Sequence, residues 1–171
     1  MRQGTVGLAV LITLCFLAAG PVSAQIEAPQ DLFFAEMPDD VKVQTKNLYS
    51  ANTAEQIAAA KKLGQMGAKA EPAIHYLIDA LSKEIGGSVR QAIVDALVKL
   101  GDPAKKALTD ALKSPMPEIR RMVVLALGNL KDPSTVDALA AAVLQDADPS
   151  VRQNAVAALM KIEGAGLVEK M

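Results

Sequence analysis

The chemistry open to this chain centres on one histidine, His75, with Asp79 four residues further along. Side chains four residues apart lie on the same side of a helix, so an imidazole–carboxylate pair could form on its surface. Such a pair is at most half of a usual zinc site, and the sequence has no second histidine to complete one. We therefore interpret His75 and Asp79 as a solvated surface pair rather than a metal site or an acid–base couple.

Other residue types that usually carry catalysis lack the sequence context for it. Cys15, the one cysteine of the chain, lies in an N-terminal apolar run that we expect to be removed. The mature protein would then have no thiolate nucleophile and no cysteine ligand for a metal. No serine stands in a nucleophile motif, and no GxxxxGK(S/T) phosphate-binding loop occurs. We predict no catalytic residue, no metal and no cofactor, and that the protein is not an enzyme.

The apolar run from Val6 to Ala19 has the features of a secretory signal peptide. It follows the positively charged Arg2, and small residues ending at Ala24 offer a cleavage site. As a helix the run would rise about 21 Å, less than the roughly 30 Å hydrocarbon core of a bilayer, so cleavage is favoured over an uncleaved membrane anchor. We expect residues 1–24 to be a signal peptide and the mature protein to be exported, periplasmic or secreted, without a membrane span.

The composition of the chain favours closely packed helices. Of its 171 residues, 51% are hydrophobic but only 3% are aromatic, so alanine, leucine and valine must supply most of the core. The formal net charge is −1, which gives no broad electrostatic attraction to nucleic acid or to anionic lipid. We therefore predict no nucleic-acid partner.

Three segments of the chain repeat nearly the same pattern around Arg90, Arg120 and Arg152. Apolar residues recur one position before each arginine and three, six, seven and ten positions after it. These offsets all fall on one side of a helix with 3.6 residues per turn, so each segment is predicted to be a helix with a buried stripe. Six positions after each arginine stands an alanine that would let the next helix approach closely. These alanines are Ala96, Ala126 and Ala158.

The breaks between the predicted helices also repeat. Asp102-Pro103 and Asp132-Pro133 are expected to end one helix and cap the next, because aspartate is a good N-cap and proline suits the first helical position. Pro117 and Pro149 open the next arginine-bearing helices, the second of them with Asp148 as its cap.

An earlier and more diverged unit has Gln56 in the arginine position. Its second helix is expected to begin near Pro72. Capping boxes at Thr53–Gln56 and Ser88–Gln91 are predicted to begin the first helices of this unit and of the next one.

Helix pairs that repeat every 30 to 34 residues are typical of a solenoid. Residues 53–162, including "DPSVRQNAVAAL" from Asp148, resemble the HEAT-like repeats first grouped with phycobilisome lyase subunits, whose pattern begins DPxVRxxAAxAL. The resemblance implies an all-α fold, an α-solenoid (superhelix) of HEAT-like helix pairs. We expect three pairs and an unpaired fourth helix over residues 149–162.

The resemblance also implies a structural ladder between adjacent units, in which Arg90, Arg120 and Arg152 pair with acidic residues at the turns. The candidate partners are Glu84, Asp146 and Asp148. The turn before Arg120 has Ser114 and Met116 instead, which leaves the ladder at Arg120 open.

In this repeat family the arginine-bearing helices line the concave face. Positions one, five and eight after each arginine lie opposite the buried stripe, and together they predict a shallow, partly apolar groove with Arg121 at its centre. Such a groove suits a protein or peptide partner. The alternative is that curvature brings these rows into contact with one another. The predicted partner-binding residues are Gln91, Asp95, Val98, Arg121, Leu125, Gln153 and Met160.

The two ends of the mature chain differ from the repeats. In the N-terminal segment, residues 25–52, the stretch "DLFFAEMP" is expected to cap the first repeat, and a tethered partner-binding motif is the alternative. Residues 163–171 form a predicted C-terminal tail. Because the last helix lacks a full partner, a homodimer through the C-terminal end is a further hypothesis.

These observations favour a non-catalytic protein-binding scaffold or an accessory subunit of an exported complex. One alternative is a lyase-like or maturation factor that holds a substrate protein for modification. Another is a structural component of the cell envelope. The repeat itself does not distinguish them, because one fold serves many unrelated functions.

Overall fold

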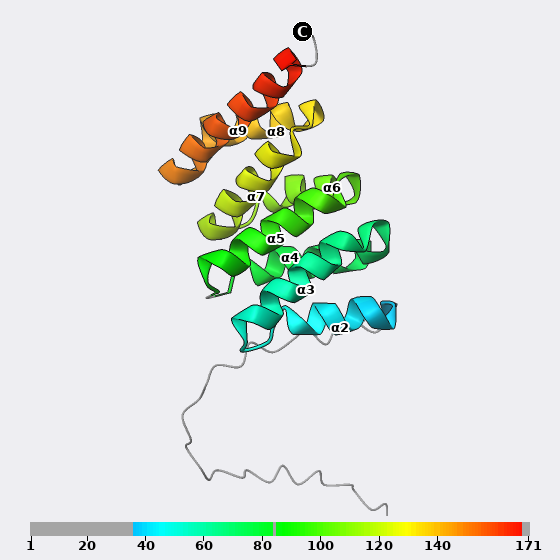
Figure 1. The fold of residues 1–171 in the computed structure, drawn as a ribbon. Coiled ribbons are helices and arrows are strands. Elements are labelled where there is room, and N and C mark those ends of the chain that lie inside the picture. The colour runs from blue at the N-terminus through cyan, green and yellow to red at the C-terminus, as the bar shows by residue number, and fades with distance from the viewer. Residues whose placement is uncertain (1–35, 84, 169–171) are drawn as a thin grey trace, which may run out of the picture.

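The computed structural model describes residues 36–83 and 85–168, which fold into a stack of α-helices (Figure 1). The predicted signal peptide, residues 25–35 of the predicted cap and Glu84 lie outside the described residues. The described helices are α2 (Asp39–Asn47), α3 (Thr53–Gln65), α4 (Ile74–Ala80), α5 (Gly87–Leu100), α6 (Asp102–Ala111), α7 (Pro117–Leu130), α8 (Val136–Gln145) and α9 (Pro149–Val168), with 3-10 helices η1 (Gly67–Ala73) and η2 (Pro133–Thr135).

The helices form two layers. Helices α3, α5, α7 and α9, in which the repeated arginines and Gln56 lie, follow one another along what we call the arginine layer, and α4, α6 and α8 form the second layer. The chain alternates between the layers, giving three helix pairs and α9. This arrangement confirms the all-α solenoid of helix pairs. Packing along the arginine layer is closer than along the second layer. Because neighbouring helices lie closer together in the arginine layer than in the second layer, the stack curves toward the arginine layer.

The buried stripe of each arginine-layer helix matches the repeat pattern. In α5, Val89, Ile93, Ala96 and Leu97 are all buried. Their counterparts in α7 and α9 are buried as well, except that Leu159 near the end of the stack is partly exposed. A single apolar core therefore continues from unit to unit, as a solenoid requires.

Two glycines bring neighbouring arginine-layer helices close together. A Cβ atom added to Gly64 would lie 2.8 Å from the Cα atom of Ala96, and one added to Gly128 would lie 2.7 Å from the Cβ atom of Ala158. Both glycines lie eight positions after the arginine position, and each faces the alanine six positions after the next arginine. The close approach predicted at Ala96 and Ala158 is confirmed. Its cause is a glycine on one helix opposite an alanine on the next.

Helix α2 and the residues around it cover the first unit. Met37, Val41, Leu48 and Tyr49 are buried, and α2 packs against α3 and η1. These residues belong to the part of the predicted N-terminal cap that the structure describes. The first unit therefore does not expose its apolar face at this end of the stack.

The Tyr49 hydroxyl fixes this N-terminal segment to α4. It donates a hydrogen bond to Asp79 Oδ2 at 2.9 Å and lies 3.3 Å from the carbonyl oxygen of Tyr76. Asp79 also forms an ion pair with Lys83 Nζ at 3.5 Å, whereas the His75 side chain is exposed. Asp79 therefore has a structural role that its spacing from His75 did not indicate.

Replacing Tyr49 with phenylalanine is expected to lower the free energy of unfolding by about 1 kcal/mol, because the ring stays buried while its hydrogen bonds are lost. Urea unfolding followed by circular dichroism measures this change. In an Asp79→Ala background the same substitution should cost less, since the stronger acceptor is already absent. Equal costs in the two backgrounds would show that the Tyr49–Asp79 hydrogen bond contributes nothing.

Two predicted capping boxes are wrong, by small shifts of helix start. Helix α3 is capped by Asn52, whose Oδ1 accepts a hydrogen bond from the backbone N–H of Ala54 at 2.9 Å, and not by Thr53. Helix α5 begins after Gly86, which has no side chain to cap with, so Ser88 already lies inside the helix. The Gln91 side chain donates to Asp95 Oδ1 instead of reaching back to the helix start.

The repeated Asp-Pro pairs behave in two ways. Asp132 and Asp148 are caps as predicted, accepting hydrogen bonds from the backbone N–H groups of Ser134 and Ser150. Asp102 is not a cap, because Gly101 occupies that position with a φ of +64°, which glycine adopts without strain. Asp102 then lies in the first turn of α6.

The last helix is longer than predicted. Helix α9 continues to Val168, so the predicted C-terminal tail that begins at residue 163 starts as helix. The predicted end rested on the glycines at 164 and 166, which weaken a helix but do not stop it.

Candidate functional site

Five of the seven predicted partner-binding residues lie on the surface of the arginine layer. Gln91, Asp95 and Gln153 are exposed, and Arg121 and Leu125 are partly exposed. They occupy the positions one and five after each arginine. We call this set, on α5, α7 and α9, the arginine-layer surface.

The other two predicted residues, Val98 and Met160, differ from this set, and partner binding by them stays a prediction. Both lie eight positions after their arginine, where Gly64 and Gly128 contact the next helix of the stack. Val98 is accordingly packed against the core. Met160 is 68% exposed because no further helix follows α9 in the described part of the chain. The eighth position after each arginine is thus part of the packing between units. For this position the alternative interpretation holds, in which residues of neighbouring arginine-layer helices contact one another.

Three polar contacts hold side chains of the arginine-layer surface in place. Arg121 Nη2 donates to Glu118 Oε1 at 3.1 Å, and Arg121 Nη1 lies 3.9 Å from Asp148 Oδ2, the carboxylate that caps α9. The Gln91 amide donates to Asp95 Oδ1 at 2.8 Å. The surface therefore presents positioned polar groups of both charges, with Leu125 as its apolar member.

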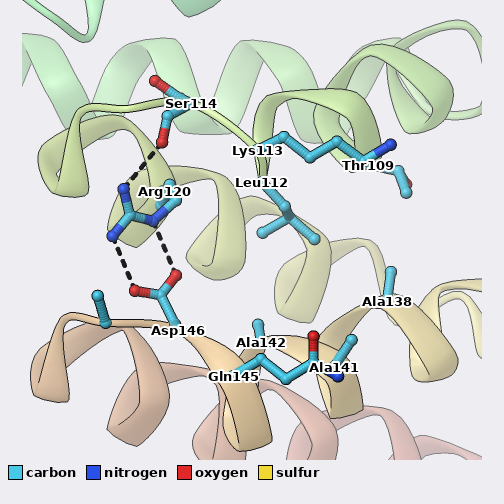
Figure 2. Close-up of a pocket in the computed structure, with 11 residues that line it drawn as sticks. Thr109, Leu112, Lys113, Ser114, Arg120, Ala138, Ala141, Ala142, Gln145 and Asp146 are labelled. Carbon is cyan, nitrogen blue, oxygen red and sulfur yellow. Dashed lines mark hydrogen bonds and ion pairs between the residues drawn. The ribbon is translucent and has the colours of Figure 1, made fainter.

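The arginine ladder is strongest at Arg120. Its Nε and Nη2 atoms donate to the two carboxylate oxygens of Asp146 at 2.7 and 2.8 Å, and its Nη1 atom donates to the carbonyl oxygen of Ser114 at 2.8 Å (Figure 2). Only 12% of the Arg120 side chain and 7% of the Asp146 side chain are exposed. A bidentate pair of this kind is stronger than a surface ion pair, and it connects α7 to the turn between α8 and α9.

The other two arginines bind backbone carbonyls of their own turns. Arg152 Nη1 donates to the carbonyl oxygen of Asp146 at 2.7 Å, and Arg90 Nη2 lies 3.4 Å from that of Lys83. The sequence prediction placed the acidic partner of Arg120 in the turn before its helix, but Asp146 lies in the turn before the next arginine-bearing helix. The residue of that kind for Arg90 is Ser114, which is not acidic. The ladder of arginine–acid pairs is therefore interrupted at Arg90.

A second tie between units was not recognised in the sequence. Lys105 on α6 donates to the Asp132 carboxylate, which belongs to the next unit, and also pairs with Asp102 Oδ1 at 2.9 Å. Hydrogen bonds from Lys105 and Ser134 lower the pKa of Asp132 from 3.8 to about 2. Hydrogen bonds from Arg120 lower the pKa of Asp146 as well. Lysine and aspartate at this separation, 27 residues, give no periodic signal.

These lowered pKa values predict acid sensitivity. A carboxyl group whose pKa is lower in the folded state contributes stability that is fully present above its unfolded pKa, 3.8, and is lost as pH falls through its folded pKa, about 2 for Asp132. The free energy of unfolding should therefore fall as pH drops from about 5 toward 2. Asp132→Asn should reduce that fall, measured by urea unfolding at each pH. Asp137→Asn, an exposed carboxylate on α8, should leave it unchanged, and an equal effect of the two substitutions would contradict this assignment.

A cleft of about 480 Å³ opens between α6 and α8 in the second layer (Figure 2). Its apolar lining includes Leu112 and alanines of α8, and the Arg120–Asp146 pair lies at one end. Nothing in the sequence analysis pointed to this cleft, since the predicted groove was assigned to the other layer.

Within the described residues, no group of three or more histidine, cysteine, aspartate or glutamate side chains could hold a metal ion. No helix in the same residues is both long and apolar enough to span a membrane.

The family model for HEAT repeats matches residues 42–115 and 106–170 of the chain. The chain therefore belongs to the HEAT-repeat family, and the first match begins inside α2. HEAT repeats imply a protein–protein interaction scaffold. A search of curated proteins finds no match to this chain. The resemblance is thus confirmed for HEAT repeats, and the narrower grouping with phycobilisome lyase-type repeats stays a prediction.

Proposed function

We propose that this protein is an exported, non-catalytic scaffold or accessory subunit that binds a protein or peptide partner on the arginine-layer surface. The observation that carries the proposal is the exposure of Gln91, Asp95 and Gln153 in a layer whose buried stripe is used for packing. Side chains that are not buried between neighbouring helices are accessible to a partner.

The chemistry of this surface suits a partner with a mixed interface. Asp95 and Arg121 offer opposite charges on adjacent helices, and Leu125 lies beside them as the apolar member. Protein interfaces combine an apolar centre with a polar rim, and arginine is enriched in them. Because Glu118 and Asp148 already hold the Arg121 guanidinium, less side-chain freedom is lost when a partner binds.

Export is the second part of the proposal. The support for it is the N-terminal sequence, in which a charged residue, an apolar run and small residues follow one another up to Ala24. N-terminal sequencing of the protein recovered from the cells that make it should begin at Gln25. Recovery from the cytoplasm with residues 1–24 still attached would contradict export and leave the binding proposal untouched.

The binding proposal is tested by matched charge reversals on the two layers. Asp95 on α5 and Asp110 on α6 are both exposed aspartates of the same unit, but they belong to different layers. Tagged wild-type, Asp95→Lys and Asp110→Lys proteins would be recovered from producing cells under mild conditions, and the bound proteins quantified by mass spectrometry. Asp95→Lys should lose the partner, whereas Asp110→Lys should retain it.

Two results would count against this binding surface. Loss of the partner from Asp110→Lys alone would assign binding to the second layer. Equal recovery of the partner by all three proteins would show that Asp95 is not at the interface. Circular dichroism should first confirm that the three proteins have the same helix content.

A further inference from the structure

The cleft between α6 and α8 exists because one of its walls is made of small side chains. Ala138, Ala141 and Ala142 line it at the spacing of a single helix face, and Leu112 lies on the α6 side (Figure 2). Methyl groups are too short to reach Leu112 across the gap. The cleft thus depends on the short side chains of α8 together with the facing side of α6.

We call the contact between the α2 segment and α4 the first junction, and the equivalent space there is filled. Tyr49 ends the buried series Val41, Thr45, Leu48, Tyr49, and Leu112 ends the series Ala104, Leu108, Ala111, Leu112, which has the same spacing. Tyr49, just after α2, and Leu112, just after α6, therefore occupy corresponding places. In α4, which lies between these two helices, the corresponding residue is the buried Leu81.

The residues that contact Tyr49 also have counterparts in the cleft. Leu77 in α4 and Leu139 in α8 are both fully buried. When the two helices are aligned at these leucines, Tyr76 corresponds to Ala138 and Asp79 corresponds to Ala141. The Tyr49 hydroxyl bonds to the Tyr76 carbonyl oxygen and to Asp79. At the α6–α8 junction a leucine replaces the tyrosine, and alanines replace the residues that it contacts. The aromatic ring that closes the first junction has no counterpart here.

The charge at the rim of the cleft indicates which chemical group a ligand would carry next to an aromatic ring. The Arg120 guanidinium is committed to Asp146 and Ser114. Lys113 is exposed on the rim, and no carboxylate of the described residues pairs with it. A ligand with a carboxylate next to its ring would therefore complement the remaining positive charge.

From these observations we propose that the α6–α8 cleft is a second recognition site, which takes an aromatic side chain with an adjacent carboxylate from a partner peptide. The ring would lie between Leu112 and the alanines of α8, in the place that Tyr49 has at the first junction, and the carboxylate would lie near Lys113. This site is on the second layer, so it does not depend on binding at the arginine-layer surface.

Nuclear magnetic resonance on the isotope-labelled protein tests the site with defined probes. The probes are N-acetyl-Phe-Asp-amide, N-acetyl-Ala-Asp-amide and N-acetyl-Phe-Lys-amide. The Phe-Asp probe should shift amide signals of Thr109, Ala138, Ala141 and Ala142 with millimolar affinity, as expected for a small fragment. Both other probes should bind about tenfold more weakly or not at all.

A matched pair of variants locates the binding. Ala141 on α8 and Ala157 on α9 are both exposed alanines, so tryptophan can be placed at either without disturbing the core. Ala141→Trp should weaken Phe-Asp binding at least about tenfold by occupying the cleft, and Ala157→Trp should leave it unchanged. Lys113→Ala should reduce the preference for Phe-Asp over Phe-Lys.

Several results would overturn the proposal. These are equal binding of the Ala-Asp probe, shifts that survive Ala141→Trp, and no shifts at millimolar concentrations of the Phe-Asp probe. Shifts of the cleft signals with protein concentration alone would mean that a second copy of the chain occupies the cleft. That result would also contradict a site for a peptide partner.

Discussion

Replacing Arg120 with alanine is expected to lower the free energy of unfolding by about 3–5 kcal/mol, the usual cost of removing one member of a buried ion pair. The nearly buried Asp146 carboxylate would lose the two donors of Arg120 and keep the backbone N–H of Asp148. The Ser114 carbonyl oxygen would also lose its Arg120 donor. Since the pair connects α7 to the turn that leads into α9, the C-terminal end of the stack should loosen first. Urea unfolding gives the total change, and hydrogen exchange shows which helix is affected.

Arg90→Ala provides the matched control for this prediction. Within the described residues its guanidinium has one long contact, 3.4 Å from Nη2 to the Lys83 carbonyl oxygen, so a cost of about 1 kcal/mol or less is expected. In addition, Arg120→Ala combined with Asp146→Ala should cost less than the sum of the two single substitutions. Similar costs at Arg90 and Arg120 would contradict the assignment of the ladder to Arg120.

Replacing Gly128 with alanine is expected to destabilise the protein by about 1–3 kcal/mol, although alanine is the better helix former. The added Cβ atom would lie 2.7 Å from the Cβ atom and 2.8 Å from the Cα atom of Ala158. A backbone atom cannot move aside as a side chain can, so α7 and α9 must separate. Thermal or urea unfolding of the variant measures the cost.

Gly87→Ala is the control for the glycine prediction. It makes the same substitution inside α5, but nothing lies within 4 Å of the added Cβ atom. There the better helix propensity should act alone and leave stability equal or raise it by up to about 1 kcal/mol. If both substitutions stabilised the protein, the close contact between Gly128 and Ala158 would not be limiting.

The fold could be predicted from the sequence because it rests on many repeated positions. The buried stripe around Arg90 recurs around Arg120 and Arg152, and each occurrence supports the same period. An error at one position, such as the capping box at Ser88, does not change the period. The existence of the helices therefore followed from local patterns, whereas their order in layers followed from the resemblance to HEAT-like repeats.

Features that depend on the register between units could not be predicted in this way. The acid for Arg120 lies 26 residues further along, and the return of the chain through α8 brings it there. The eighth position after each arginine was assigned to the open surface, because a single helix does not show that Gly128 faces Ala158 of the next one.

The cleft is the clearest case of this limit. A run of alanines in α8 is compatible with tight packing wherever the facing helix supplies long side chains. Only the structure shows that Leu112, at the end of α6, does not fill the space in front of these alanines. A cavity depends on the atoms of both walls, which are separated in the chain, so neither wall predicts it alone.

Site-specific photo-crosslinking in the producing cells tests the central claim, that a protein partner binds the arginine-layer surface. A photoreactive amino acid would be placed at Gln91 or Gln153 on that surface, and at Lys106 or Asp137 on the second layer, four exposed positions. The account predicts that one protein is crosslinked from Gln91 and from Gln153, and that it is not crosslinked from Lys106 or Asp137. Crosslinks from the second-layer positions alone, or from none of the four, would contradict it.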